Sequence, residues 1–521
     1  MITQTTIKSG EYYDSVTLLQ VAQGLMNLAG IEDAAVIMAT PANKGLLASG
    51  NLLTPEAEAA GADDLVIAVR AVDEATAAAA LVEAERLMKA SRQAPAESGG
   101  LGAPPKTVGA AIERLGGEAN IALVSVAGRY AAGVAREALH RGMHVFLFSD
   151  NVAVEDEIAL KTLAREKGLL VMGPDAGTAI INNVALGFAN VVPAGPVGVV
   201  AASGTGLQAV TCYMSRLGVG ITQAIGVGGR DLKSAVGGIM MLEGLKALQA
   251  DPATKVILLV SKPPSADVAE QILMRVEASE KPAVVLFLGG DPAAVELAGA
   301  LPAADMEEAV ILAAAVALSK DPGAALAELR EQQSGLQARA AELKARLQPE
   351  QRYFRGLFSG GTFCYETQLI LKSMGIEAHS NAPVEKRLRM ADSNQSVGHV
   401  AVDLGEDEFT VGRLHPMIDP TLRNRRIVQE AKDPETAVIF LDVVIGYGSH
   451  ADPAGEAVKA IQEARAAAKA EGREIVFVAS VCGTESDPQD LSKQEQKLHE
   501  AGVVVLPTNA AATRLAGAIL T

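Results

Sequence analysis

Four hydrophobic segments of this sequence end in short runs that combine glycine with serine, threonine or arginine. The runs are Ser203-Gly204-Thr205, Gly228-Gly229-Arg230, Ser359-Gly360-Gly361-Thr362 and Cys482-Gly483-Thr484, and Asn509 follows another hydrophobic segment. Glycine lets backbone N–H groups approach a ligand closely, and a helix that starts at the same point directs its positive end there. The hydroxyl groups add donors, so the runs predict sites for phosphate or carboxylate groups. The alternative is that each run is only a tight connection between a strand and a helix.

A further loop, Ala127-Gly128-Arg129-Tyr130, leads into a predicted helix. Gly128, Arg129 and Tyr130 are the candidate residues for binding a cofactor through its nucleotide or phosphate part, and Arg129 is the strongest because of its charge. The loop lacks the G-x-G-x-x-G fingerprint, and the G-x-x-x-x-G-K motif of phosphate-binding loops is absent from the chain. Neither a nicotinamide enzyme nor a P-loop enzyme is therefore indicated.

Two histidines lie close to an aspartate after an apolar segment. His415 precedes Asp419, and His450 precedes Asp452 in a stretch that follows the strand-like segment containing Asp442. His415, His450 and Asp442 are the candidate catalytic residues, as acid–base or oxyanion-stabilising groups. The alternative is helix capping and Asp-Pro turns. No His or Cys spacing typical of a metal site is present, so no metal is expected.

The elements that must position these residues follow a strand–helix–strand rhythm, which predicts parallel sheets in an α/β fold. A Ser/Gly/Pro-rich stretch at 94–106 separates a small first domain from the rest. We predict a ferredoxin-like α+β domain at 1–93, a Rossmann-like domain at 107–192, a flavodoxin-like domain at 193–320, a helical linker at 321–350 and a second flavodoxin-like domain at 351–521.

Composition limits the partners. The 521 residues carry 45 basic and 62 acidic side chains, a net charge of −17, which argues against nucleic acid or an anionic membrane as a partner. Three distant cysteines fit a reducing compartment. No signal peptide and no membrane-spanning run is recognised, so a cytoplasmic protein is expected.

The order of the motifs resembles a known family. Gly173-Pro174-Asp175, then 197–205, then 226–231 are similar to the α-subunit of succinyl-CoA synthetase, and 351–521 resembles the ligase domain of its β-subunit. The whole layout, with the small first domain, resembles the FdrA family. The resemblance implies acyl-CoA-synthetase-like domains and CoA or a phosphorylated substrate as ligand, although no cofactor is fixed by the sequence.

One departure concerns the phospho-accepting histidine of the α-subunit family. The matching stretch, 289–300, contains no histidine, so a phosphohistidine relay is not available there. The FdrA family resembles a subunit of the carbamoyltransferase that uses carbamoyl phosphate and oxamate in purine and allantoin degradation. That activity, within a homo- or hetero-oligomer with other enzyme subunits, is our first expectation. One alternative is an acyl-CoA ligase with a displaced nucleophile or a separate ATP-binding subunit. The other is a non-catalytic scaffold that binds a metabolite.

Overall fold

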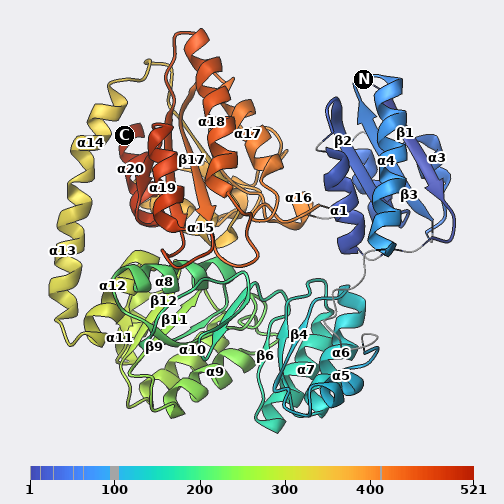
Figure 1. The fold of residues 1–521 in the computed structure, drawn as a ribbon. Coiled ribbons are helices and arrows are strands. Elements are labelled where there is room, and N and C mark those ends of the chain that lie inside the picture. Colours follow the sequence, from blue (N-terminus) through green and yellow to red (C-terminus); the bar gives the residue numbers. More distant parts are fainter. Residues whose placement is uncertain are drawn as a thin grey trace. The chain divides into compact units, whose positions relative to one another are not determined.

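The computed structural model describes residues 2–93, except 12, 14, 27, 51 and 63, and residues 105–521, except 411 and 412. The chain forms two compact units (Figure 1). The first unit contains Met1–Pro104 together with Asp407–His415, and the second contains Pro105–Glu406 together with Pro416–Thr521. A short segment of the C-terminal part of the chain therefore belongs to the N-terminal unit.

The first unit is an antiparallel sheet covered by helices on both faces. Its strand order is β1-β3-β2, with β1 at Ile2–Lys8, β2 at Ile31–Met38 and β3 at Leu65–Ala71. Alternate residues of β3 serve the two faces, as the period of a strand requires. Leu65 and Ile67 share a core with α1 (Ser15–Met26) and α4 (Glu74–Gln93), whereas Val66 and Ala68 share one with α2 (Pro41–Ser49) and α3 (Pro55–Ala59). The segment from 407 adds the short helix α16 (Asp407–Thr410) to this unit.

The second unit begins with a small parallel sheet. Its order is β4-β5-β6, at Ile121–Val124, His144–Leu147 and Val171–Met172, and its helices are α5 (Val108–Arg114), α6 (Gly128–His140) and α7 (Val154–Lys167).

The next sheet has seven strands in the order β13-β12-β11-β9-β10-β7-β8. Parallel pairing joins β9 (Ala194–Ala201), β10 (Ile221–Gly226), β11 (Val256–Ser261), β12 (Ala283–Phe287) and β13 (Leu301–Pro302). Its helices are α8 (Gly204–Arg216), α9 (Ile239–Ala250), α10 (Ala266–Glu277), α11 (Pro292–Leu297) and α12 (Met306–Ala317). The antiparallel hairpin β7 (Thr178–Ile181) and β8 (Val184–Gly187) extends this sheet, so the range 107–192 contributes strands to it.

The last sheet has six parallel strands in the order β15-β16-β14-β17-β18-β19. The strands are β14 (Tyr353–Phe358), β15 (Ala378–His379), β16 (His399–Asp403), β17 (Thr436–Val444), β18 (Val476–Cys482) and β19 (Val504–Leu506). Its helices are α15 (Gly361–Ser373), α17 (Thr421–Ala431), α18 (Pro453–Ala470), α19 (Leu491–Glu500) and α20 (Asn509–Leu520).

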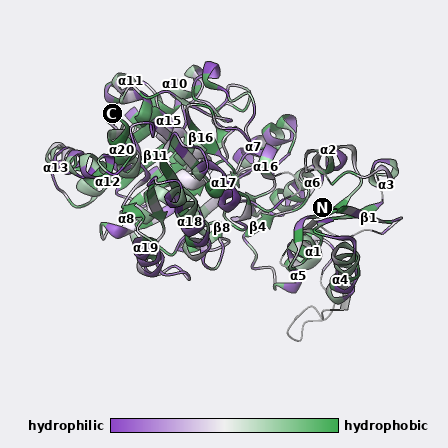
Figure 2. Ribbon diagram, turned by 90° about the horizontal axis from the view of Figure 1, so that it is seen from above, coloured by the Kyte–Doolittle hydropathy of each residue, from purple (hydrophilic) through white to green (hydrophobic). Residues whose placement is uncertain are grey.

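The seven-stranded and six-stranded sheets share one apolar core. Leu207 of α8, Val310 of α12, Phe363 of α15 and Leu515 of α20 all belong to it. The helices α13 (Pro322–Ser334) and α14 (Leu336–Lys344) connect the two sheets along the outside of the unit, where α14 packs against α20 (Figure 1). The strands carry most of the apolar colour in Figure 2, as expected for sheets covered by helices. In the described part of the chain, no helix combines the length and apolar character needed to cross a bilayer.

Candidate functional site

Two predicted loops, 159 residues apart in the sequence, meet between the seven-stranded and six-stranded sheets. Ser203 follows β9 and begins α8, and its Oγ accepts a hydrogen bond of 2.9 Å from the N–H of Gly206. Thr362 lies in the first turn of α15, directly after β14. The Ser203 and Thr362 hydroxyls are hydrogen-bonded to each other. The amino ends of α8 and α15 therefore face one another.

These helix starts retain unused donors. The first N–H groups of a helix have no partner within it. Among the described residues, no protein acceptor receives the N–H of Gly204, Thr205, Gly361 or Thr362. The bond between the two hydroxyls uses one proton, so the other hydroxyl proton is available as well. The site combines two positive helix ends with up to five free donors, which is suited to a phosphate or carboxylate.

Close approach of the two loops depends on glycine. A Cβ atom at position 360 would lie 2.7 Å from Thr205 Cγ2, and one at position 206 would lie 3.2 Å from Thr362 Cγ2. A Cβ atom at position 204 would lie 3.5 Å from the Cα atom of Gly177, an ordinary contact distance. A side chain at position 360 would push the two helix ends apart, so this glycine allows the site to form.

Asp403, the last residue of β16, is the carboxylate beside this site. A Cβ atom at position 361 would lie 2.5 Å from Asp403 Oδ2, so this oxygen rests against the start of α15. Burial is the largest effect on this group and raises the pKa of Asp403 to about 7, and the Glu406 charge adds to it. The sequence prediction did not include Asp403, although an aspartate that ends a strand just before Leu404-Gly405 was a usable signal.

The N–H groups of Ser359 and Gly360 are already occupied by the protein. Asp442 of β17 accepts the Ser359 N–H at 2.8 Å and the Gly360 N–H at 2.9 Å. Its ion-pair partner is the buried Arg423, whose Nη1 lies 3.4 Å away and also donates to Ser359 Oγ at 2.8 Å. Burial raises the pKa of Asp442, and the Arg423 guanidinium opposes that rise. Asp442, which was predicted as a catalytic residue, thus occupies the N–H groups of the predicted anion loop at 359–360.

The carboxylate that follows the loop at 228–230 binds the start of α9 and not the loop itself. Asp231 accepts the N–H groups of Met240 and Met241 at the start of α9, and Lys161 Nζ lies 2.8 Å from its Oδ1. Arg230 pairs with the buried Glu157 at 2.9 Å. Gly228 has a φ of +81°, and a Cβ atom there would overlap the carbonyl oxygen of Pro174. Gly229 is exposed and faces open space. This loop joins two parts of the second unit.

The loop at 482–484 contains a third internal carboxylate. Asp487 accepts the Thr484 N–H at 2.8 Å and that of Val191 at 2.8 Å, and Thr484 Oγ1 donates to the Val191 carbonyl. Cys482 is buried, and a Cβ atom at Gly483 would overlap Ile445. Here too the donors of a predicted anion site are used within the protein.

Asn509 lies at the start of α20, on the wall of a pocket between α8, α15 and α20. Its Nδ2 donates to Glu366 Oε2 at 2.8 Å. Burial, the largest effect on Glu366, raises the pKa of that carboxyl to about 8. Cys482 lines the same pocket.

The two candidate histidines belong to different units. His415 is in the first unit, where burial lowers its pKa to about 4, so it is neutral at pH 7. His450 is in the second unit, and its Nδ1 accepts the Asp452 N–H at 3.0 Å. That bond leaves the neutral ring with its proton on Nε2. Asp452 itself caps α18 by accepting the Gly455 N–H at 3.1 Å.

Gly128, Arg129 and Tyr130 form the first turn of α6. The residue before them, Ala127, provides no side-chain cap. Arg129 and Tyr130 are exposed, and the guanidinium carbon lies 4.8 Å from the centre of the tyrosine ring. A Cβ atom at Gly128 would overlap the backbone of Asp150 and Asn151, so only glycine fits there.

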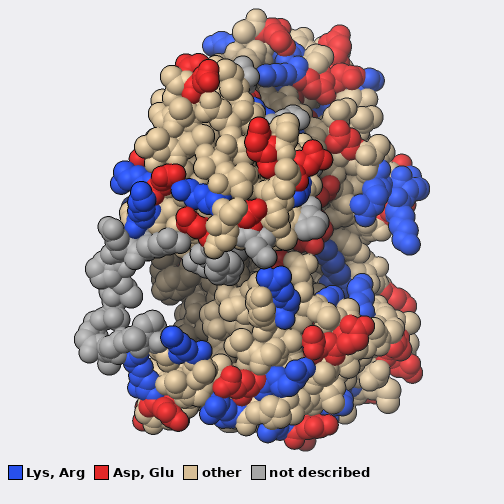
Figure 3. Space-filling view, turned by 90° about the vertical axis from the view of Figure 1, so that its right-hand side faces the viewer, with Lys and Arg blue, Asp and Glu red and all other residues tan. Residues whose placement is uncertain are grey.

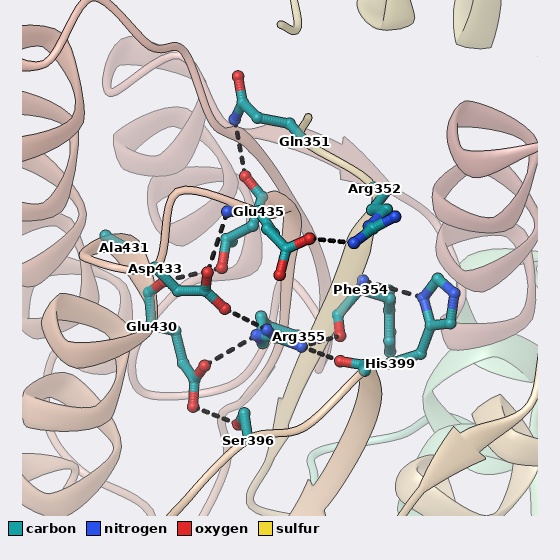
Figure 4. A network of polar contacts seen from close by, with 12 residues as sticks. Gln351, Arg352, Phe354, Arg355, Ser396, His399, Glu430, Ala431, Asp433 and Glu435 are labelled. Carbon is teal, nitrogen blue, oxygen red and sulfur yellow. Dashed lines mark hydrogen bonds and ion pairs between the residues drawn. The ribbon is translucent and has the colours of Figure 1, made fainter. Parts of the chain in front are cut away.

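A second polar cluster lies near the amino end of β14 (Figure 4). Arg355 is almost fully buried and pairs with Glu430 at 2.9 Å and with Asp433. Glu430 also accepts a hydrogen bond of 2.6 Å from Ser396. Because parallel sheets bind ligands at the carboxyl ends of their strands, this cluster is on the structural side of the sheet.

The charged side chains are spread over the surface on the face drawn in Figure 3, where acidic and basic groups are scattered among other residues. Across the residues that the structure covers, no cluster of three or more His, Cys, Asp or Glu side chains could hold a metal ion.

Three family models match the chain. The CoA-ligase model matches residues 357–519 and the CoA binding domain model matches 194–289. The model described as "AllF, heavy metal-associated domain" matches 1–104, a range that contains neither cysteine nor histidine. The CoA binding domain model thus falls on the seven-stranded sheet.

Named relatives point to the same ligases. The malate–CoA ligase subunit alpha of Methylorubrum extorquens is 30% identical over 192 residues, which is 35% of this chain and 62% of that one. Among solved structures, the dinucleotide-forming acetyl-coenzyme A synthetase 1 of Ca. Korarchaeum cryptofilum is 16% identical, with 77% of this chain and 82% of that chain covered and a TM-score of 0.32. The chain therefore spans less than two thirds of the ligase subunit that it matches in sequence.

A relative of nearly equal length is the uncharacterized protein YahF of Escherichia coli K12. It is 45% identical over 505 residues, which cover 97% of this chain and 96% of YahF. The α/β fold, with its CoA-binding and CoA-ligase domains, is that of the acyl-CoA and succinyl-CoA synthetases. The protein belongs to the family of YahF.

Proposed function

We propose that this protein is an acyl-transferring subunit of the acyl-CoA ligase type, which binds an acyl phosphate between α8 and α15 and transfers the acyl group to CoA. The observation that carries the proposal is the meeting of two helix starts at Ser203 and Thr362, with their N–H groups unused. The named ligase relatives and the CoA-ligase and CoA binding domain matches support CoA as the acceptor.

The donors suit the leaving phosphate of such a transfer. The CoA thiolate attacks the carbonyl carbon, the bond between that carbon and the phosphate oxygen breaks, and phosphate departs with the electron pair. The positive ends of α8 and α15 and the N–H groups of Gly204, Thr205, Gly361 and Thr362 stabilise the charge that develops on the phosphate. Lys262, an exposed cation that follows β11, acts electrostatically on Asp403 beside the site and provides an additional charge.

The start of α6 is the proposed contact for the phosphates of CoA. Its first N–H groups have no side-chain cap from Ala127, and Arg129 is exposed beside them. An exposed guanidinium and free helix-start donors fit a phosphate ester. Gly128 lets the helix begin against the backbone of Asp150.

The source of the acyl phosphate is a separate matter. The stretch 289–300 lacks the histidine that would relay a phosphoryl group, so this chain needs an acyl phosphate made elsewhere, for example by an ATP-binding partner subunit. This same feature favours a second candidate, transfer of the carbamoyl group from carbamoyl phosphate to oxamate, as the resemblance to the FdrA family implies. Carbamoyl phosphate is a preformed acyl phosphate and needs no relay.

The test is a pair of transfer assays on the purified chain, alone and with its partner subunits. Acetyl phosphate with CoA is followed by thioester absorbance, and carbamoyl phosphate with oxamate is followed by phosphate release. The variant Thr362→Val removes a site hydroxyl, and we expect it to lower the transfer rate at least tenfold in whichever assay is active. Thr421→Val, which removes an exposed hydroxyl at the start of α17, is the matched control and should keep full activity.

The outcome decides between the candidates. Thioester formation supports the ligase type, and phosphate release that depends on oxamate supports the carbamoyltransferase. Ligand binding without either activity, in the presence of the partner subunits, would leave only a metabolite-binding scaffold and would overturn the proposal.

A further inference from the structure

Asp403 differs from the other polar groups around the site in having one oxygen without a partner. The Asn381 side chain binds the backbone of Asp403 through two hydrogen bonds. The Asp403 N–H donates to Asn381 Oδ1 at 2.8 Å, and the Asp403 carbonyl accepts from Asn381 Nδ2 at 2.9 Å. Its Oδ1 accepts the Gly405 N–H at 2.9 Å. In the part of the chain covered by the structure, Oδ2 receives no hydrogen bond, although the residue is only 4% exposed.

The free oxygen is directed at the helix start that forms the site. Oδ2 would lie 2.5 Å from a Cβ atom of Gly361, whose N–H group is one of the unused donors. In a residue that is almost fully removed from water, a carboxyl oxygen without a protein donor is costly when it is ionised and acceptable when it is protonated. The geometry therefore favours the neutral acid, with its proton on the oxygen that faces the site.

The surrounding charges act on this group from every neighbouring element. Glu406, after β16, and Asp442, on β17, both raise the pKa of Asp403, whereas Lys262, after β11, lowers it. The thiol of Cys364 on α15 is buried and uncharged, since burial raises its pKa as well. Desolvation is the largest effect, and the pKa of Asp403 rises to about 7.

We propose that Asp403 is the proton-carrying group of the anion site, which binds a proton together with the anion and donates it to the ligand from Oδ2. This inference rests on the proposed function of the site as a phosphate-binding site. An ionised carboxylate at this position would repel a dianion, but a carboxylic acid adds one donor to those of α8 and α15. Binding below pH 7 then needs no proton from solution, and binding above pH 7 takes up about one proton.

Calorimetry with sulfate tests this, because sulfate keeps both charges across pH 5.5–8.5 while phosphate titrates. Affinity should be constant at low pH and should weaken by about tenfold per pH unit above the pKa of Asp403. Measurement in two buffers with different ionisation enthalpies counts the protons taken up, and we expect a value that approaches one at pH 8.

Two variants isolate the group. Asp403→Asn keeps Oδ1 and places a permanent donor at Oδ2, so it should bind sulfate about as well as the native protein does at low pH, without proton uptake and without pH dependence. Glu406→Gln removes one of the charges that raise the Asp403 pKa, so it should shift the decline in affinity to lower pH while proton uptake persists.

The results separate this inference from the proposed function. If native protein fails to bind sulfate at every pH, the anion site itself is wrong and both proposals fail. If native protein binds sulfate without proton uptake, or if Asp403→Asn shows the same uptake, the role of Asp403 is wrong while the site remains.

Discussion

Two aspartates flank the same strand but differ in how many of their carboxylate oxygens have hydrogen-bond partners. In the six-stranded sheet β14 lies between β16 and β17, and Asp403 of β16 is aligned with Phe358, the last residue of β14, while Asp442 of β17 follows the partner of Leu357. Asp442 receives two backbone N–H groups and an arginine. Asp403 receives one N–H group and has an oxygen to spare.

The difference shows what distinguishes a structural loop from a binding loop. Asp442 and Asp487 each use both carboxylate oxygens on donors of the protein, and each binds an N–H group of a loop that looks like an anion site in the sequence. These carboxylates occupy the place that a bound anion would take. The starts of α8 and α15 instead combine free donors with Asp403, whose Oδ2 receives no hydrogen bond among the described residues.

The largest expected effect is on stability, when the ion pair between Asp442 and Arg423 is broken. Arg423→Ala would leave Asp442 buried without its cation, and we expect the free energy of unfolding to fall by about 3–5 kcal/mol. Urea denaturation followed by circular dichroism measures the loss. Arg425→Ala, on the exposed face of the same helix, should change stability by less than about 0.5 kcal/mol. Equal losses in the two variants would show that Asp442 does not depend on Arg423.

The raised pKa of Asp403 should make the stability of the protein depend on pH. The pKa of Asp403 is about 7 in the folded protein against the ordinary 3.8, so between these values the unfolded chain loses the proton and the folded chain keeps it. Stability therefore falls as pH rises from about 4 to about 7, by at most roughly 4 kcal/mol from this group, and is constant above.

Asp403→Asn cannot titrate, so the stability difference between native and variant protein should follow that curve. Denaturation at pH 5 and pH 8 measures it, and the variant should gain on the native protein at the higher pH. A difference that is flat with pH would mean that Asp403 is ionised throughout, in agreement with a closed loop like that of Asp442.

The sequence patterns predict the fold better than they predict the site. The rhythm of apolar segments and glycine predicts the parallel sheets, because strand hydrophobicity and loop glycine are local properties. The order of motifs indicates the ligase-type domains because each motif is also a local property of the sequence. The segment Asp407–His415 joins the first unit although it lies within the last domain in sequence, and no local pattern indicates that exchange.

The site depends on which donors are already used, and that is decided by tertiary partners. Ser359 and Ser203 sit in similar runs, yet Asp442 from 83 residues away occupies one and Thr362 from 159 residues away meets the other. The sequence prediction included both serines and Asp442, but assigned the aspartate to catalysis, and it did not include Asp403. The free oxygen of Asp403 becomes visible only once its three neighbouring donors and acceptors are placed.

A smaller effect is expected from filling the space beside Asp403. Gly361→Ala would bring a Cβ atom to 2.5 Å from Oδ2, which must move away from the site. We expect sulfate affinity to fall about tenfold, or about 1.4 kcal/mol, measured by calorimetry at pH 6. Gly229→Ala is the control, because a Cβ atom there meets open space. Loss of affinity in the Gly229 variant would place the anion at the 228–230 loop instead.

The smallest effect separates a capping hydroxyl from a binding hydroxyl. Ser203 and Thr107 both cap a helix, by accepting the N–H of Gly206 at 2.9 Å and of Ala110 at 3.1 Å. Replacing either by alanine removes one cap and should cost about 1 kcal/mol of stability. Only Ser203 also meets Thr362 across the two helix starts. Thermal unfolding with and without sulfate tests this: both variants should melt earlier, but only Ser203→Ala should lose part of the stabilisation by sulfate. Equal responses to sulfate would mean that Ser203 only caps α8. The anion site would then depend on Thr362 and Asp403.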